Sequence, residues 1–280
     1  MKKDWSERTI VTTGRKFHAD SVALAQKTAQ KLDVPYVERK NASIEELRAE
    51  YQKDLVLVAK KGLLMLETKD GELFFHPNMA HLRLRNLRFT DQGDRMAEAM
   101  GLQIGMSVLD CTLGFAADAI VASFLTGAEG NVTGIESSPL IAEITGYGLA
   151  HFHAENYPIQ EAMRRIRVIS MDCMDFLRQA EADSYDIVYF DPMFRYPLMD
   201  SKNLNPLRSI ADHRPISTEA IREAKRVARM RVVLKETAKS TEFDRLGFPR
   251  KTGGRYSKVQ YGVIELAKCD TIVENGCGFR

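Results

Sequence analysis

The stretch that decides the fold spans residues 185–194 and reads YDIVYFDPMF. Its first six residues form a short apolar run with β-branched and aromatic side chains, which predicts a buried strand. The strand is expected to end at Asp191-Pro192, because proline lacks the N–H that a sheet needs and holds the preceding residue extended. A carboxylate is therefore expected at the carboxyl end of a strand, where open α/β sheets bind their ligands.

The composition is typical of a packed globular protein. The chain has 280 residues, of which 44% are hydrophobic and 28% charged, so it suits one large or two ordinary domains. A net charge of +2 is too small to identify a nucleic-acid-binding protein by itself. The four cysteines form no CxxC pair, which argues against a disulfide framework and against a metal site. The first residues, MKKDWSER, carry no apolar signal segment, and no run is long enough to span a membrane, so we expect a cytoplasmic protein without a membrane partner.

Residues 1–90 are expected to form a smaller α+β accessory domain. A β-α-β pattern comes first, followed by a strand meander in which Asp70-Gly71 marks a hairpin turn. We expect Asp20 to cap the first long helix. The predicted strands lie at 10–12, 35–37, 55–58, 63–66 and 73–75, and the predicted helices at 21–32 and 44–51.

Strands and helices alternate in residues 91–268, and residues 269–280 form a tail. Strands separated by helices of ten to fifteen residues predict an α/β fold with a parallel, doubly wound sheet. The predicted strands lie at 108–110, 132–135, 168–170, 185–190, 231–235 and 259–266, and the predicted helices at 116–125, 139–155, 174–180 and 218–228.

Acidic residues follow three successive strands of this pattern: Asp110, Glu136 and Asp172. In a doubly wound sheet they line up along one edge of the ligand crevice. Glu136 is placed to accept hydrogen bonds from both hydroxyls of a ribose, and Asp172 from an adenine amino group. Gly114 lets the backbone approach a ligand, and Asp118 opens the next helix beside a positively charged ligand group.

The loop at residues 110–118, DCTLGFAAD, has one glycine and two carboxylates. A dinucleotide requires the fuller G-x-G-x-x-G pattern, because its pyrophosphate rests on a bare helix N-terminus. Carboxylates repel a pyrophosphate but suit the ammonium and sulfonium groups of S-adenosylmethionine (SAM). The loop therefore indicates a SAM site, and a nicotinamide-dependent oxidoreductase ranks third among the alternatives.

The acceptor side is expected at Asp191, Pro192 and Phe194. An exocyclic amino group on a base is a poor nucleophile, because its lone pair is delocalised into the ring. A carboxylate and a backbone carbonyl that accept its two N–H groups favour a pyramidal nitrogen aimed at the methyl group. Phe194 is expected to stack on the base, and catalysis then depends on proximity and alignment.

These motifs resemble those of the class I SAM-dependent methyltransferases, and within them the RsmJ-type methyltransferases of 16S ribosomal RNA, which act on guanine N2. The resemblance covers roughly residues 55–265 and implies a Rossmann-like, seven-stranded methyltransferase sheet. The residues that carry it are Met79-Ala80-His81, residues 110–114, Asp118, Glu136, residues 191–194 and residues 231–235. It implies SAM contacts at Ala117, Asp118, Glu136, Ser137, Asp172, Cys173 and Asp191. Ala117 and Ser137 depart from the family pattern, which has arginines there, and Tyr196-Pro197 replaces a more basic continuation.

Two basic segments are candidates for RNA contact. Arg83, Arg85 and Arg88 precede the methyltransferase pattern, and the loop at residues 250–256 mixes glycine, basic and aromatic residues. Phosphate contact and an ordinary solvated surface both remain open for these segments. The expected RNA-binding residues also include Lys235, Arg250, Lys251, Arg255 and Tyr256.

The sequence therefore predicts a SAM-dependent N-methyltransferase that acts on an exocyclic amino group of a base in RNA, first of all guanine N2 in small-subunit ribosomal RNA. Its expected partner is ribosomal RNA or the small ribosomal subunit. Two alternatives stay open: transfer to another amine, such as adenine N6, a protein or a small molecule, and a non-catalytic SAM-binding module.

Overall fold

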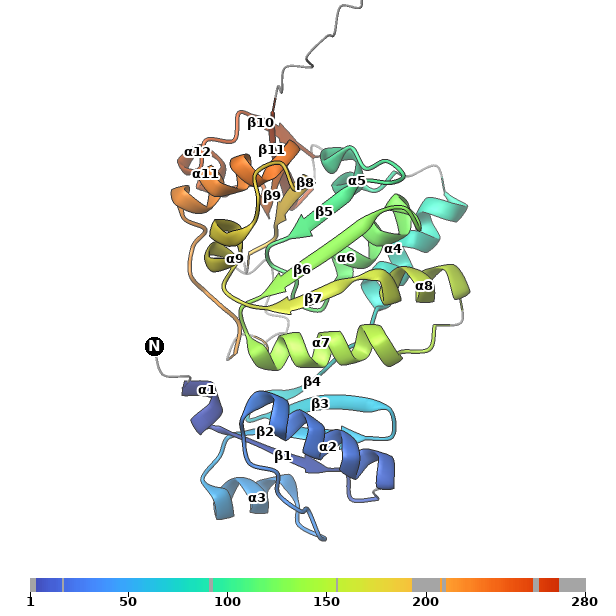
Figure 1. Ribbon diagram of the computed structural model, residues 1–280, viewed down its shortest axis with the longest axis vertical. Helices are drawn as coiled ribbons and strands as arrows, with labels where there is room; N and C mark the ends of the chain where they lie inside the picture. Colours follow the sequence, from blue (N-terminus) through green and yellow to red (C-terminus); the bar gives the residue numbers. More distant parts are fainter. Residues whose placement is uncertain are drawn as a thin grey trace, which may run out of the picture.

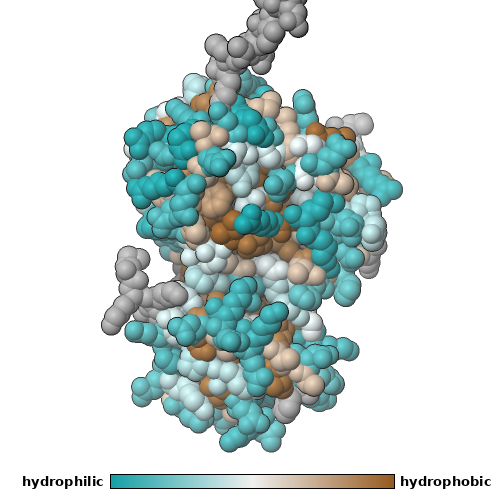
Figure 2. All heavy atoms as spheres, viewed as in Figure 1, coloured by the Kyte–Doolittle hydropathy of each residue, from teal (hydrophilic) through white to brown (hydrophobic). Residues whose placement is uncertain are grey.

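The computed structural model describes residues 4–16, 18–90, 93–154, 156–192, 207, 210–253 and 257–266. The described residues form a four-stranded and a seven-stranded sheet, which lie one below the other in Figure 1. On the face that Figure 2 shows, hydrophobic residues gather near the middle of the molecule, and hydrophilic residues surround them.

The smaller sheet belongs to the N-terminal part of the chain, and its strand order is β1-β2-β3-β4. β1 and β2 pair in parallel, whereas β3 and β4 continue as antiparallel hairpins. Alternate strand residues face opposite helices: Val11 packs with the α2 side and Ile10 with the α3 side. The elements are α1 (Asp4–Glu7), β1 (Thr9–Thr13), α2 (Ala19–Leu32), α3 (Ile44–Tyr51), β2 (Leu55–Lys60), β3 (Leu63–Thr68) and β4 (Gly71–Phe74).

The larger sheet has the order β10-β11-β9-β8-β5-β6-β7. Its five strands from β9 to β7 are parallel, and β11 and β10 complete one edge in antiparallel pairing. The predicted doubly wound, seven-stranded α/β sheet is confirmed. The strands are β5 (Ser107–Asp110), β6 (Asn131–Glu136), β7 (Arg167–Ser170), β8 (Tyr185–Phe190), β9 (Ala228–Thr237), β10 (Arg250–Thr252) and β11 (Val259–Glu265).

Helices cover both faces of the larger sheet. One core contains buried residues of α4 (Asn78–Phe89), α5 (Arg95–Met100), α6 (Ala117–Thr126), α7 (Pro139–His151) and α8 (Tyr157–Arg165). The other contains residues of α9 (Cys173–Gln179), α11 (Thr218–Val227) and α12 (Glu242–Arg245). Among the described residues, no helix is both long and apolar enough to cross a membrane.

Helix α7 joins the two sheets. It lies between them in Figure 1 and contacts both β3 and β7. Phe75 packs so closely on Gly148 of α7 that a side chain at position 148 would overlap its ring. Lys31 on α2 also forms an ion pair with Glu143 on α7, with 2.5 Å between Nζ and Oε2. The hydrophobic core is therefore continuous between the sheets, and the division of the chain at residue 90 stays a prediction.

Several local expectations are corrected. Residues 78–89, 95–100 and 157–165 form helices that the sequence analysis did not predict, and the helix expected to reach residue 155 ends at His151. Helix α2 is preceded by His18, without a side-chain cap, rather than capped by Asp20. Residues 250–252 are a strand, not part of a loop, and around Tyr36 the described backbone forms an isolated bridge to Val11.

Candidate active site

A cavity of about 850 Å³ opens at the carboxyl ends of the parallel strands. Its wall brings together most of the residues that the sequence singled out. They are Arg83, Asp110, Gly114, Ala117, Asp118, Glu136, Ser137, Asp172, Cys173, Asp191, Pro192 and Lys235.

The loop after β5 is fixed by its neighbours on both sides. The amide of Asp191 donates to Thr112 Oγ1 at 2.6 Å, and the amide of Leu113 donates to the carbonyl of Ile135 at 3.0 Å. Gly114 follows with a φ of +51°, which favours glycine because it has no Cβ. Ala116 adopts a φ of +61° directly before α6. The loop therefore turns sharply and presents its backbone to the cavity.

Glu136 is held by two backbone amides at the end of β6. Gly114 N donates to Oε2 at 2.9 Å, and Ser138 N donates to Oε1 at 2.8 Å. Burial raises the pKa of Glu136, and these two hydrogen bonds oppose the rise. Each carboxylate oxygen keeps a further acceptor site, so a diol can still bind.

An ionic network crosses the floor of the cavity. Arg83 from α4 contacts Asp118 and also bonds Asp94 at 2.7 and 2.8 Å. Lys235 Nζ lies 3.1 Å from Asp118 Oδ2 and 2.7 Å from Asp191 Oδ2. The hydroxyl of Tyr189 donates to Asp118 Oδ2 at 2.8 Å. Arg83 and Lys235 therefore pair with carboxylates of the cavity wall, and their expected contact with RNA stays a prediction.

The carboxylates of this network differ in proton affinity. Burial raises the pKa of Asp191 to about 7, while the nearby Lys235 ammonium opposes the rise. Burial also acts on Asp118, but Lys235 and Arg83 together hold its pKa well below the ordinary value. Asp118 is thus the stable anchor of Lys235, and Asp191 is a carboxylate that can exchange a proton near neutral pH.

The charge balance of the cavity fits a cationic ligand such as SAM. Among the described lining residues there are six carboxylates (Asp110, Asp118, Glu136, Asp172, Asp191 and Asp212) and four cations (Arg83, Arg95, Arg214 and Lys235). Asp110 is 2% exposed, and its hydrogen bonds come from the backbone amide and hydroxyl of Thr112. Burial raises its pKa to about 8. A bound ammonium or sulfonium group would stabilise the ionised form of this carboxylate.

The adenine side of the predicted site includes residues that the sequence analysis missed. Asp172 caps α9 through the amide of Met174 and accepts a hydrogen bond from Arg214 at 2.6 Å. Arg214 also bonds Asp212, at 2.9 Å from its Nε. These residues lie before α11, and no local motif links them to the end of β7. Burial raises the pKa of Cys173 to about 11, so this thiol stays protonated at neutral pH.

The other predicted RNA contacts that the structure describes lie away from the cavity wall. Arg85 and Arg88 are exposed on α4. Arg250 pairs with Glu265 at 2.6 Å, and Lys251 with Asp244 at 2.8 Å. Phe194, Arg255 and Tyr256 lie outside the described residues. In the described part of the chain, no three His, Cys, Asp or Glu residues are grouped so that they could hold a metal ion.

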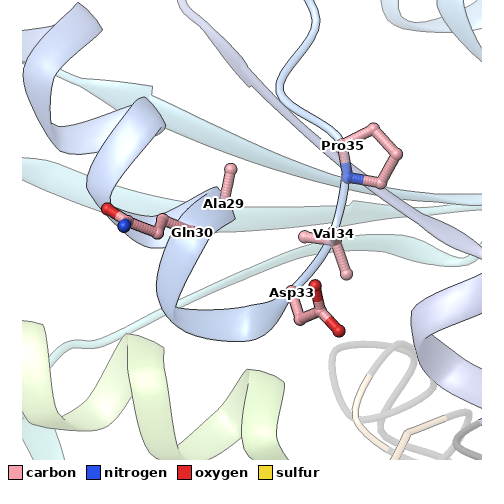
Figure 3. Close-up of a pocket in the computed structure, with 5 residues that line it drawn as sticks. All are labelled: Ala29, Gln30, Asp33, Val34 and Pro35. Atoms are coloured by element: carbon pink, nitrogen blue, oxygen red, sulfur yellow. The ribbon is translucent and has the colours of Figure 1, made fainter.

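A second hollow, of about 370 Å³, lies at the end of α2. Figure 3 shows that its walls come from the last turn of the helix and the loop that follows, residues 29–35. Asp33 is its only ionisable lining residue among those described, and it is exposed. This hollow gathers no catalytic set.

Comparisons with known proteins agree with this geometry. The family model "Putative SAM-dependent methyltransferase" matches residues 40–246. The uncharacterized protein YpiP of Bacillus subtilis is 37% identical over 263 residues, which cover 92% of this chain and all of that protein. Ribosomal RNA small subunit methyltransferase J of Pseudomonas fluorescens is 28% identical over 61% of this chain and 65% of its own length, which is just under two thirds. A crystal structure of a SAM-dependent methyltransferase from Neisseria gonorrhoeae superposes with a TM-score of 0.62 at 18% identity and covers 95% of this chain and 99% of that one, which shows the common fold.

Proposed function

Because the chain belongs to the family of SAM-dependent methyltransferases, we propose that it methylates an exocyclic amino group of a base in RNA, and specifically guanine N2 of small-subunit ribosomal RNA. SAM is the cofactor, and it supplies an activated methyl group on a sulfonium. The observation that carries the proposal is that one cavity gathers three carboxyl groups from neighbouring strands: Asp110 and Glu136 end β5 and β6, and Asp191 follows β8.

In this proposal the cofactor lies along the strand ends. Glu136 accepts hydrogen bonds from the ribose, and Asp172 faces the adenine. Asp110, Gly114 and Asp118 surround the methionine part, where the buried Asp110 ionises when the cationic groups of SAM bind beside it. Ala117, Ser137 and Cys173 contribute packing and backbone contacts in the same wall.

Asp191 and Pro192 form the acceptor side. Asp191 accepts an N–H of the amino group, which aims the nitrogen lone pair at the methyl group. As the nitrogen bonds the methyl carbon, the bond from that carbon to the sulfonium sulfur breaks, which leaves a neutral thioether and moves the positive charge to the nitrogen. The nitrogen then carries an extra proton, and Asp191 can take that proton because its pKa is about 7. Phe194, which lies outside the described residues, stays in this proposal as the residue that stacks on the base.

The choice of RNA rests on the names of relatives and on exposed cations. Several relatives at 28 to 29% identity are named ribosomal RNA small subunit methyltransferase J. Arg85 and Arg88 remain candidates for phosphate contact, as do Arg250 and Lys251, although each of the latter two already pairs with a carboxylate.

The test is transfer of tritium from methyl-labelled SAM to small ribosomal subunits and to free ribosomal RNA, both taken from a strain that lacks this gene. Digestion of the product to nucleosides identifies the modified base. We expect N2-methylguanosine, with no label from Asp191→Ala and full label from Asp175→Ala, an exposed carboxylate on α9. A labelled adenosine would correct the base, and an unlabelled RNA with intact SAM binding by calorimetry would refute the RNA assignment.

A further inference from the structure

Helix α4 carries an exposed apolar stripe that begins at the active-site cavity. Met79, Leu82 and Phe89 are 60%, 44% and 71% exposed, although they are large hydrophobic residues. On an α-helix, positions 79, 82, 86 and 89 are separated by three or four residues and so share one face, about 15 Å long, in which the polar Asn86 lies between Leu82 and Phe89. The opposite face is already used, because Ala80 and Leu84 are buried and α4 packs on α6.

The stripe is continuous with the active site. Met79 lines the cavity wall, and Arg83, one turn later, points inward to Asp94 and Asp118. The same helix therefore has an inner side that helps build the cavity and an outer side that leads away from its mouth.

Positive charge accompanies the stripe. Arg85 and Arg88 are exposed, and neither forms an ion pair with any described carboxylate. The guanidinium of Arg88 lies 5.3 Å from the centre of the Phe89 ring, so the end of the stripe combines a flat cation with an aromatic face. Apolar and aromatic surface flanked by free arginines matches a single-stranded nucleic acid, whose bases stack and whose phosphates are anionic.

The reaction creates a need for such a surface. Asp191 lies in a cavity, so a base can reach it only after it leaves the stack of its neighbours, which costs unstacking energy. A surface beside the mouth that offers new stacking partners to the flanking nucleotides repays part of this cost.

We propose that the outer face of α4, formed by Met79, Leu82, Arg85, Arg88 and Phe89, binds the RNA segment that flanks the target base. This inference rests on the proposed function. Phe89 and Leu82 stack on or pack against bases, and the two arginines contact phosphates. Because Leu82, Arg85, Arg88 and Phe89 do not line the cavity, these four residues contribute to RNA affinity and not to SAM affinity.

The experiment compares Leu82→Ala, Phe89→Ala and Arg85→Ala in the full chain. Affinity for SAM is measured by calorimetry, and affinity for ribosomal RNA by filter binding over a range of salt concentrations. Methyl transfer is then measured at subsaturating and saturating RNA. Matched controls are Tyr51→Ala on α3, an aromatic residue that is 40% exposed, and Arg222→Ala on α11.

We expect Phe89→Ala to weaken RNA binding by about 5- to 150-fold, the range for loss of one stacked base, with KM raised and kcat kept. Arg85→Ala should reduce by about 1 the slope of the logarithm of RNA affinity against the logarithm of salt concentration. SAM affinity should not change. If the Leu82 and Phe89 variants bound RNA as tightly as the wild type, the α4 proposal would be overturned. Methylation of RNA by the wild type would still support the proposed function. If these variants lost binding to intact ribosomal subunits but bound free RNA as the wild type does, the face would be assigned to a protein partner, and the α4 proposal would be overturned as well. Failure of the wild type to methylate any RNA would overturn both proposals.

Discussion

Replacing Lys235 with methionine should slow methyl transfer near neutral pH and move its pH dependence to higher pH. Lys235 Nζ lies 2.7 Å from Asp191 and 3.1 Å from Asp118, and both contacts are lost in the variant. Methionine keeps an apolar stem of similar length, so the packing around the strand end is retained. Asp118 still has Arg83, whereas the described structure gives Asp191 no second cation in direct contact.

The size of the effect follows from the proton affinity of Asp191. Its pKa is about 7 with Lys235 in place. A cation at this distance lowers a carboxyl pKa by about 1 to 3 units, so the variant should titrate between about pH 8 and 10. At pH 7.5 about three quarters of Asp191 is ionised in the wild type. In the variant the ionised fraction falls to about one quarter if the pKa is about 8, and below about 1% if it is about 10. Since only the ionised carboxylate can take the proton that the methylated nitrogen releases, the rate should fall by about 3- to 250-fold.

The assay is the single-turnover rate of methyl transfer between pH 6 and 10, with SAM affinity measured in parallel. Lys235→Arg should restore most of the rate at pH 7.5, because it restores the charge, and Lys27→Met, at an exposed lysine on α2, should behave as wild type. A Lys235→Met variant that binds SAM, transfers methyl groups and keeps the wild-type pH midpoint would refute the reasoning.

Four further predictions concern the cofactor side. Because burial raises the pKa of Asp110 to about 8, SAM binding should release a proton and tighten as the pH rises from 6 to 8, and Asp110→Asn should abolish this slope in calorimetry. The raised pKa of Asp110 also makes stability depend on pH. Its contribution to the stability of the SAM-free folded state is fully present below the unfolded pKa of about 4 and is lost as the pH rises through 8. The free energy of unfolding, measured with denaturant, should therefore depend less on pH in Asp110→Asn than in the wild type. Glu136→Gln should weaken SAM by about 10- to 150-fold, the range for hydrogen bonds to a charged group, and leave RNA binding intact. Arg214→Ala should change the free energy of unfolding by less than about 1 kcal/mol, because Arg214 is 64% exposed and exposed ion pairs contribute little.

The sequence predicted the larger sheet well because its strands carry signals that do not depend on distant contacts. The apolar run that ends at Asp191-Pro192 and the acidic residues at successive strand ends lie in phase with the strand–helix alternation. The parallel topology then brings Asp110, Glu136 and Asp191 to one cavity without further information.

Helix α4 was missed because its polarity pattern is weak. Of its residues, only Ala80 and Leu84 are buried, and its arginines made the segment look like an ordinary solvated surface. The inward position of Arg83 depends on Asp94 and Asp118, which are 11 and 35 residues away. The position of Arg214 depends on Asp172, 42 residues away. Such pairs are set by tertiary packing, and spacing along one chain does not reveal them.

The ionic network connects α4 to the acceptor side of the active site. Arg83 on α4 contacts Asp118, Asp118 contacts Lys235, and Lys235 contacts Asp191. The helix proposed to bind the flanking RNA is therefore connected by three direct ion pairs to the carboxylate proposed to receive the target amino group. Loss of the Arg83 contact would leave Lys235 as the cation that the described structure places in direct contact with both Asp118 and Asp191. We therefore expect Arg83→Gln to slow methyl transfer through Asp191, because Lys235 would then be shared between two carboxylates without the help of Arg83.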